Sequence, residues 1–116
     1  MEWHGVVNFG GELKIKIQDD IADHALVFMF RPYKHTWIQP IACFATKGAA
    51  SGSVLFEQIV KAISTLFNKN AVVKSCVSDG AQTNKSAMGL LQVKGSNSGD
   101  CKPYINHPID PSIKIY

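Results

Sequence analysis

The sequence predicts an α/β fold in which a mixed sheet is flanked by helices. Two apolar runs in the first half of the chain, 25–30 and 37–44, have the length and composition of paired strands. A segment with helical periodicity follows over about 54–68. An apolar stretch over 71–77 then ends close to Asp79 and precedes a second helix-like segment, the alternation that is typical of α/β sheets.

The composition is that of one small globular domain. The chain has 116 residues, of which 46% are hydrophobic and 18% charged, and it contains no linker-like segment, so we expect one domain over 1–116. The net charge of +3 permits nucleic-acid binding without indicating it. No apolar run approaches the roughly 20 residues that cross a bilayer, so we expect no membrane partner. Three widely spaced cysteines favour a reducing compartment over a disulfide framework.

The strand predictions rest on apolar patterning. In the first 23 residues, 6–9 and 13–17 are candidate short strands. The continuous apolar run 25–30 predicts a strand that is buried on both faces. Its hairpin partner, 37–44, contains Pro40, which cannot donate a ladder hydrogen bond and therefore predicts a sheet edge or a bulge. We expect Cys43 and Cys76, which stand in strand-like runs, to be core residues.

Two helices are predicted in the second half of the chain. In the helix at 54–68, Leu55, Ile59, Ile63 and Leu66 form one apolar stripe. A second helix is expected over about 81–92, with Met88 and Leu91 facing inward. The chain ends in the apolar alternation 113–116, which predicts the beginning of a further strand.

Asp79 is the candidate catalytic and metal-ligating residue. It follows the predicted strand 71–77, and the carboxyl ends of strands are where α/β folds place their chemistry. A carboxylate at such a position can ligate a divalent cation. The alternative is structural, because Asp-Gly is a common turn and either Ser78 or Asp79 can cap the following helix.

Other polar residues have two interpretations each. Asn84 can contact DNA or a metal shell, or make a turn hydrogen bond. Cys101 and His107 lack the two further ligands that a zinc site needs. Asp110, between two prolines, is interpreted as a turn residue. Basic and aromatic residues share the predicted hairpin loop, which suits either nucleic-acid binding or a solvated tip; they are Arg31, Tyr33, Lys34, His35 and Trp37.

The order of the predicted elements resembles the ribonuclease-H-like fold. That fold has three antiparallel strands, a helix, a strand parallel to the first, a second helix and a further strand. In this comparison 25–30 is its second strand, 36–45 its third, 54–68 its first helix and 71–78 its fourth strand, so that Asp79 takes the second catalytic position. The first and last strands are expected to be missing or truncated, which makes 1–116 a partial domain.

Three motifs make the resemblance specific: HGVVNFG at 4–10, SDGAQTN at 78–84 and HPIDPSIKIY at 107–116. Together they resemble the P-element-type DNA transposases along nearly the whole chain. The resemblance implies a ribonuclease-H-like domain with three acidic residues that cleaves DNA and transfers strands with the aid of Mg²⁺. Only Asp79 matches one of these acids, and the other two are expected outside this chain.

The resemblance also implies properties of the complete protein. Its partners would be transposon-end and target DNA, a nucleotide would bind through a domain absent here, and the protein would be nuclear and homo-oligomeric. Two positions depart from the family pattern: Asn8 stands where Asp is frequent and Gln92 where Gly is usual.

Two function hypotheses remain open. In the first, the chain is a fragment of a transposase catalytic core and is inactive by itself, because one carboxylate cannot hold two metal ions. In the second, it is a non-catalytic, transposon-derived α/β module for interaction or DNA association. Genomic sequence that encodes the two further acids in register would favour the first hypothesis.

Overall fold

The protein is described by a computed structural model that covers residues 21–95 and 99–116. The chain divides into two compact units, Met1–Ala50 and Ser51–Tyr116. The predicted strands 6–9 and 13–17 lie outside the described residues. Among the helices that are described, none combines the length and the hydropathy needed to span a membrane.

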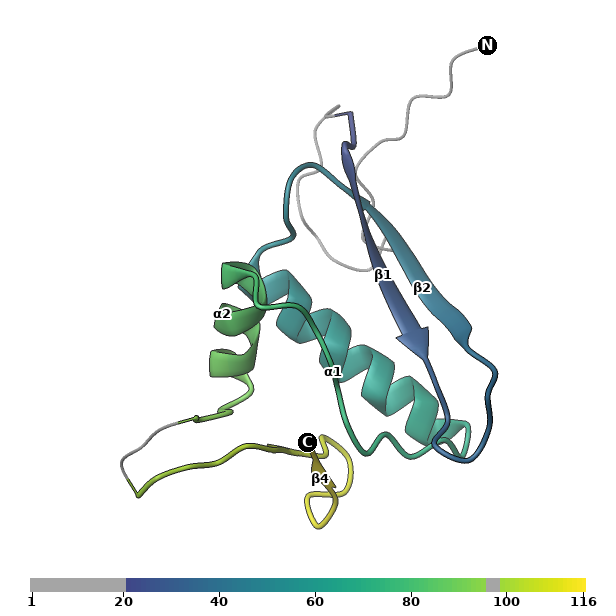
Figure 1. The fold of residues 1–116 in the computed structure, drawn as a ribbon, viewed down its shortest axis with the longest axis vertical. Helices are drawn as coiled ribbons and strands as arrows, with labels where there is room; N and C mark the ends of the chain where they lie inside the picture. The colour runs from purple at the N-terminus through teal and green to yellow at the C-terminus, as the bar shows by residue number, and fades with distance from the viewer. Residues whose placement is uncertain (1–20, 96–98) are drawn as a thin grey trace. The chain divides into compact units, whose positions relative to one another are not determined.

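The first unit contains a long antiparallel hairpin of β1 (His24–Phe30) and β2 (Gln39–Thr46) (Figure 1). The pairing slips by one residue, because Phe28 faces Ala42 while Met29 faces Pro40. Such an extra residue is a β-bulge, which tolerates the missing N–H of proline. The predicted hairpin is therefore confirmed, and so is the prediction that Pro40 stands at a sheet edge or a bulge, although the second strand begins at Gln39 and leaves Trp37 outside.

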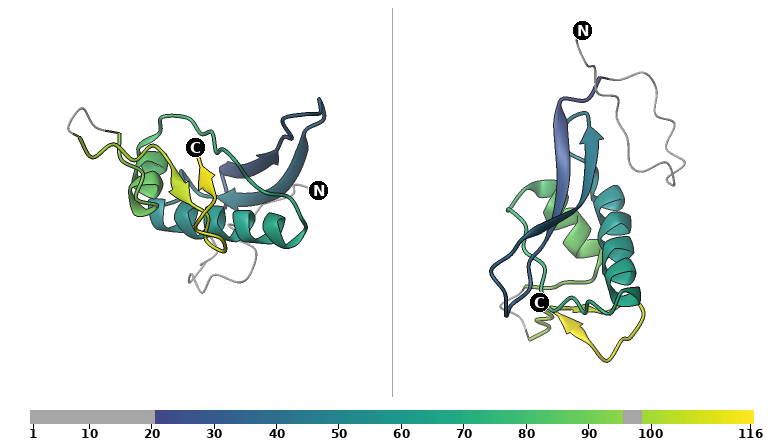
Figure 2. Two further views of the ribbon diagram at one scale, coloured as in Figure 1. Left: turned by 90° about the horizontal axis from the view of Figure 1, so that it is seen from below. Right: turned by 90° about the vertical axis from the view of Figure 1, so that its right-hand side faces the viewer.

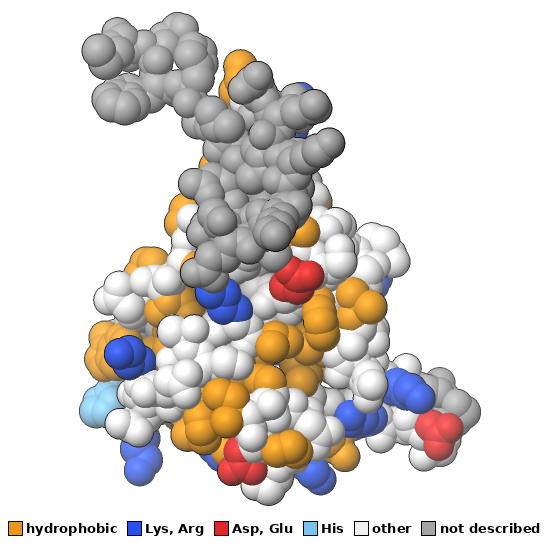
Figure 3. Space-filling view, turned by 180° about the vertical axis from the view of Figure 1, so that it is seen from behind, with side chains coloured by type: hydrophobic (Ala, Val, Ile, Leu, Met, Phe, Trp, Pro, Cys, Tyr) orange, Lys and Arg blue, Asp and Glu red, His pale blue; other side chains and the backbone are white. Residues whose placement is uncertain are grey.

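The prediction that the first strand is buried on both faces is wrong for this structure. Along β1 the exposure alternates, and Val27 and Met29 are 45% and 56% exposed. Cys43, opposite Val27, is exposed, and so is Cys76, so neither cysteine is a core residue. A continuous apolar run does not reveal whether both faces of a strand are covered. Figure 3 shows hydrophobic side chains at the surface on one face of the molecule.

In the second unit, α1 (Gly52–Asn68) confirms the predicted long helix. Ser51 caps it by accepting a hydrogen bond from the Val54 N–H. Leu55, Ile59 and Ile63 are buried as one stripe, as their spacing predicts. The second predicted helix is α2 (Gln82–Leu90), with Ala87 and the following Leu91 buried.

The helices α1 and α2 meet where α1 begins (Figure 1). A Cβ atom at Gly52 would lie 2.6 Å from the Cβ of Ser86 and 3.2 Å from the backbone nitrogen of Ala87. Real Cβ atoms do not approach other atoms so closely, so the absence of a side chain at Gly52 permits this crossing.

Both helices end in the same hydrogen-bond motif. After α1, Asn70 has φ 62°, its N–H bonds Phe67, and the next N–H, of Ala71, bonds Leu66. After α2, Gln92 also has φ 62°. Its N–H bonds the Gly89 carbonyl, and the next N–H, of Val93, bonds the Met88 carbonyl. These are Schellman motifs, whose left-handed residue is most often glycine. Gln92, where the resemblance led us to expect glycine, thus stands at a position with positive φ.

The segment predicted as strand 71–77 is not a regular strand in the structure. Its backbone meets a neighbour at one point: the Tyr116 N–H bonds the Lys74 carbonyl at 2.9 Å and the Cys76 N–H bonds the Tyr116 carbonyl at 2.7 Å. This is the slanted pattern of a parallel pair. A strand ladder needs successive pairs of this kind. Val77, the residue after this bridge, is 93% exposed.

The C-terminal segment forms a short antiparallel ladder of β3 (Ile105–Asn106) and β4 (Lys114–Ile115), drawn in yellow tones in Figure 2. Ile105 and Ile115 face each other and are buried. The strand that the alternation at 113–116 predicts is therefore present. The described residues make an α/β structure with two helices and two small sheets, while one larger mixed sheet stays a prediction.

Candidate functional site

Asp79 lies in an exposed turn between the segment at 71–78 and α2. Its Oδ1 accepts hydrogen bonds from the backbone N–H of Ala81 at 3.1 Å and from Nδ2 of Asn84 at 2.6 Å. Nδ2 of Asn84 also lies 3.3 Å from the carbonyl oxygen of Asp79. The first and last polar residues of the DGAQTN sequence thus form one hydrogen-bonded unit at the start of a helix.

This geometry separates the two oxygens of the Asp79 carboxylate. Both side-chain hydrogen bonds end on Oδ1, and Oδ2 accepts none from any described residue. The structural interpretation is right in that Asp79 forms a turn with Ala81. The helix-capping alternative is wrong, because the N-cap is Ala81 and it has no side-chain cap. Asp79 is exposed, so a ligand role for Oδ2 is compatible with the turn.

The structure gives Asn84 the turn hydrogen bond that was one of its two interpretations. Its amide fixes the rotation of the Asp79 side chain, and sequence spacing alone does not predict this contact. Within 21–95 and 99–116, no three His, Cys, Asp or Glu residues come close enough to hold a metal ion together. Asp79 therefore offers a divalent cation one carboxylate ligand from this part of the chain.

His107 is a buried turn residue. It is 1% exposed, its ring packs on Phe67 with centroids 4.6 Å apart, and its Nδ1 accepts hydrogen bonds from the N–H groups of Ile109 and Asp110 at 3.1 and 3.2 Å. Nδ1 is thus the hydrogen-bond acceptor of the ring, and the buried Nε2 has no partner among the described residues.

Asp110 also stabilises the turn between β3 and β4, as the sequence indicates. Its Oδ1 accepts hydrogen bonds from the hydroxyl and the N–H of Ser112 at 2.6 and 3.1 Å. These bonds, above all the one from the hydroxyl, lower the pKa of the Asp110 carboxyl. The carboxylate is engaged within its own turn.

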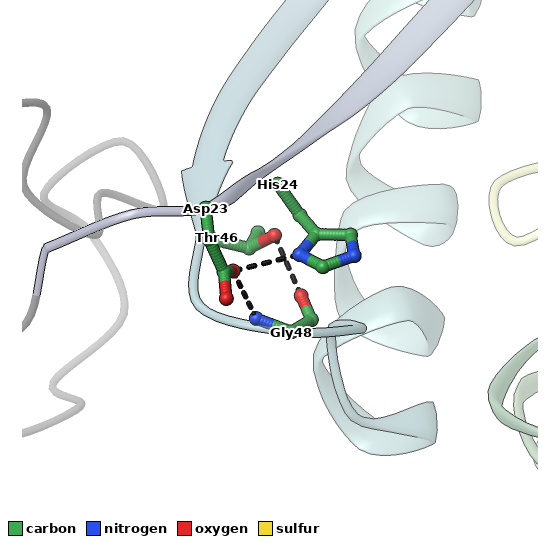
Figure 4. Close-up of polar contacts among 4 residues, drawn as sticks. All are labelled: Asp23, His24, Thr46 and Gly48. Atoms are coloured by element: carbon green, nitrogen blue, oxygen red, sulfur yellow. Dashed lines mark hydrogen bonds and ion pairs between the residues drawn. The ribbon is translucent and has the colours of Figure 1, made fainter.

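A polar cluster closes the base of the hairpin (Figure 4). Oδ1 of Asp23 lies 2.7 Å from Nδ1 of His24 and accepts the Gly48 N–H at 2.6 Å, while the Thr46 hydroxyl donates to the Gly48 carbonyl at 2.9 Å. The hydrogen bond from His24, then that from Gly48, lowers the pKa of Asp23. Gly48 has φ 66°, so the cluster shapes the turn after β2.

At the other end of the hairpin, the loop contains the basic and aromatic residues singled out above. The Trp37 ring packs on Phe30 with centroids 5.8 Å apart, and Tyr33 is 76% exposed. Trp37 therefore has a structural role, because its ring packs on Phe30. DNA binding by this loop stays a prediction.

The sequence interpretation missed a group of lysine and tyrosine residues beside β3 and β4. The Tyr104 ring contacts the ring of Tyr116 and has the amines of Lys102 and Lys114 close to it. The alternation Lys-x-Tyr-x-Asn at 102–106 was the available signal. The pairing of β3 with β4 brings Lys102 and Tyr104 close to Lys114 and Tyr116.

Comparison with known proteins identifies a family. No curated protein and no solved structure matches the chain. A family model described as "TNP-like, RNase H N-terminal domain" matches residues 1–92, which is well over half of the chain and includes both Asp79 and Asn84. The chain therefore belongs to the TNP-like RNase H N-terminal domain family, a transposase-like family.

Proposed function

We propose that this chain is part of the catalytic core of a P-element-type DNA transposase and that Asp79 ligates a divalent cation there. Family membership supports a transposase-derived, ribonuclease-H-like domain and implies DNA as the general class of partner. The main supporting observation is the Asp79–Asn84 unit. Its Oδ1 accepts the hydrogen bonds from Ala81 and Asn84, which leaves Oδ2 for a ligand.

The donor set suits one side of a magnesium site. Mg²⁺ prefers oxygen ligands and is usually bound through one or two carboxylates together with water. In a two-metal site, one ion would activate the attacking oxygen of a phosphodiester cleavage and the other would stabilise the leaving oxygen. Asp79 would hold the ion through Oδ2, and further acidic residues of the transposase would complete the site.

Asn84 would act as a positioning residue. An exposed aspartate has several rotamers, and a charge-assisted bond of 2.6 Å restricts the carboxylate to one of them. Orienting a ligand in this way commonly changes metal affinity by about 10- to 100-fold. The proposal therefore gives Asn84 a role that does not require contact with DNA.

The test is a substitution in a complete, active transposase that carries this segment. Asp79→Asn should abolish DNA cleavage and leave DNA binding intact, because the amide keeps the size of the side chain but not its charge. Asn84→Ala should raise the Mg²⁺ concentration needed for half-maximal cleavage by about 10-fold or more. Asp100→Asn, which removes an exposed carboxylate elsewhere, is the matched control.

Cleavage by the Asp79→Asn protein at a near-normal rate would remove the catalytic assignment.

The remaining expectations belong to the complete protein: action on transposon-end and target DNA, a nuclear location, assembly as a homo-oligomer and nucleotide binding through another domain. All of them depend on the P-element type, which the family match does not specify.

A second candidate function is a non-catalytic, transposon-derived interaction or DNA-associated module. It is favoured by the finding that the described residues bring no three metal-ligating side chains together. The encoding locus discriminates between the two candidates. Two further acids in register with Asp79 favour the enzyme, and their loss favours the module.

A further inference from the structure

One face of the β3–β4 ladder is built from lysine and tyrosine side chains. Successive side chains of a strand point to opposite faces, and Ile105 and Ile115 occupy the buried one. The opposite face continues through the residues that flank these strands. We call it the lysine–tyrosine face, and it consists of Lys94, Lys102, Tyr104, Lys114 and Tyr116.

The contacts within this face are direct. The Lys114 Nζ lies 4.5 Å and the Lys102 Nζ 5.5 Å from the centroid of the Tyr104 ring. The Tyr116 ring is 5.9 Å from that of Tyr104. Lys94 and Lys102 exchange both backbone hydrogen bonds, at 2.9 and 2.8 Å, which places their side chains opposite each other on the same side of the pair.

Among the described residues, no acidic side chain pairs with the lysines of this face. Neither Lys94, Lys102 nor Lys114 forms an ion pair with an acidic residue in the described part of the chain. Like charges directly opposite each other in an antiparallel pair are destabilising. The ammonium groups of Lys102 and Lys114 beside the Tyr104 ring, together with the charge of Lys94 opposite Lys102, therefore create a positive potential that a polyanion would relieve.

We propose that the lysine–tyrosine face binds single-stranded DNA. The lysines would contact successive phosphates, and the Tyr116 ring, which belongs to a side chain 62% exposed, would stack on an unpaired base. The aromatic rings decide between single strand and duplex, because base faces are accessible only when bases are unpaired. The choice of DNA as the polymer rests on the proposed function.

The experiment measures binding of a fluorescent oligothymidine to the 116-residue chain by anisotropy at several salt concentrations. Tyr116→Ala should weaken binding at least about fivefold, the loss of one base stack. Lys102→Gln with Lys114→Gln should lower the salt dependence, the slope of log K against log[salt], by about 1.4, because each lost single-strand phosphate contact contributes about 0.7. The matched control is Lys69→Gln with Lys85→Gln. It removes the same amount of charge, but from the end of α1 and from α2.

Circular dichroism and thermal melting show whether each variant is folded. Tyr116→Phe keeps the stacking ring and should bind like the unaltered chain, which separates stacking from a folding defect. Equal losses in the matched control, binding that is indifferent to Tyr116→Ala, or tighter binding of the corresponding duplex would each overturn the proposal. The readout is independent of cleavage, so Asp79→Asn should bind the oligonucleotide normally even if the catalytic proposal fails.

Discussion

His107 shows how one residue holds a turn from the inside. Its Nδ1 is the acceptor for the N–H groups of Ile109 and Asp110, and its ring packs on Phe67. We expect His107→Phe to lower the free energy of unfolding by about 1–3 kcal/mol, because it leaves two backbone donors unsatisfied in a buried turn. His107→Asn presents a side-chain oxygen near the position of Nδ1 and should recover part of that loss.

Urea unfolding followed by circular dichroism compares the two variants. If His107→Phe unfolds at the same urea concentration as the unaltered chain, the hydrogen bonds to Nδ1 contribute nothing and only ring packing matters. The position illustrates the limit of residue-level prediction. The HPIDP sequence indicates a turn, but not that its histidine is the buried acceptor.

At the scale of helices, the crossing of α1 and α2 depends on a glycine. Gly52→Ala places a Cβ 2.6 Å from that of Ser86, and neither atom can move without its backbone, so we expect a loss of stability of about 1–3 kcal/mol. Gly89, on α2, has nothing within 4 Å of the same atom. Gly89→Ala should therefore stabilise the chain by up to about 1 kcal/mol through helix propensity. A lower melting temperature for Gly52→Ala and a higher one for Gly89→Ala would confirm both predictions. Equal shifts in the two variants would contradict the helix crossing.

The end of α2 allows a second prediction at this scale. Gln92 has φ 62°, a conformation that costs a residue with a Cβ roughly 1–2 kcal/mol and glycine very little. Gln92→Gly should thus raise the unfolding free energy by up to about 1 kcal/mol, after allowing for the greater freedom of glycine in the unfolded chain. Gln92→Ala, which retains the Cβ, is the control, and a gain from alanine equal to that from glycine would refute the backbone explanation.

At the scale of the whole molecule, we expect the 116-residue chain to be inactive as a nuclease. The described residues offer Asp79 but no group of three metal ligands, whereas holding two ions requires several carboxylates. Incubation of supercoiled plasmid with the chain in Mg²⁺ or Mn²⁺ should yield no nicked product. Nicking that disappears in the Asp79→Ala variant would show that another acid of this chain, such as Glu2, Asp23 or Asp110, completes the site.

The amino-acid sequence by itself determined the elements whose signal is local. The stripe of α1, the pairing of the two apolar runs, the bulge at Pro40 and the turn at Asp79 all follow from periodicity and from residue chemistry within a few positions. Gln92 could be marked as a departure from a family pattern. That the position favours glycine became evident only from its positive φ.

The tertiary structure decided what depends on pairing between distant segments. It left one face of β1 exposed, paired the backbone of 74–76 with Tyr116 without forming a strand there, and brought Tyr104 and Lys114 together across a ladder. An apolar run is compatible with one covered face or two, and a single lysine carries no record of its neighbours. Burial and charge clustering are properties of segments that meet in space, so local sequence predicts the elements and long-range contact determines their surfaces.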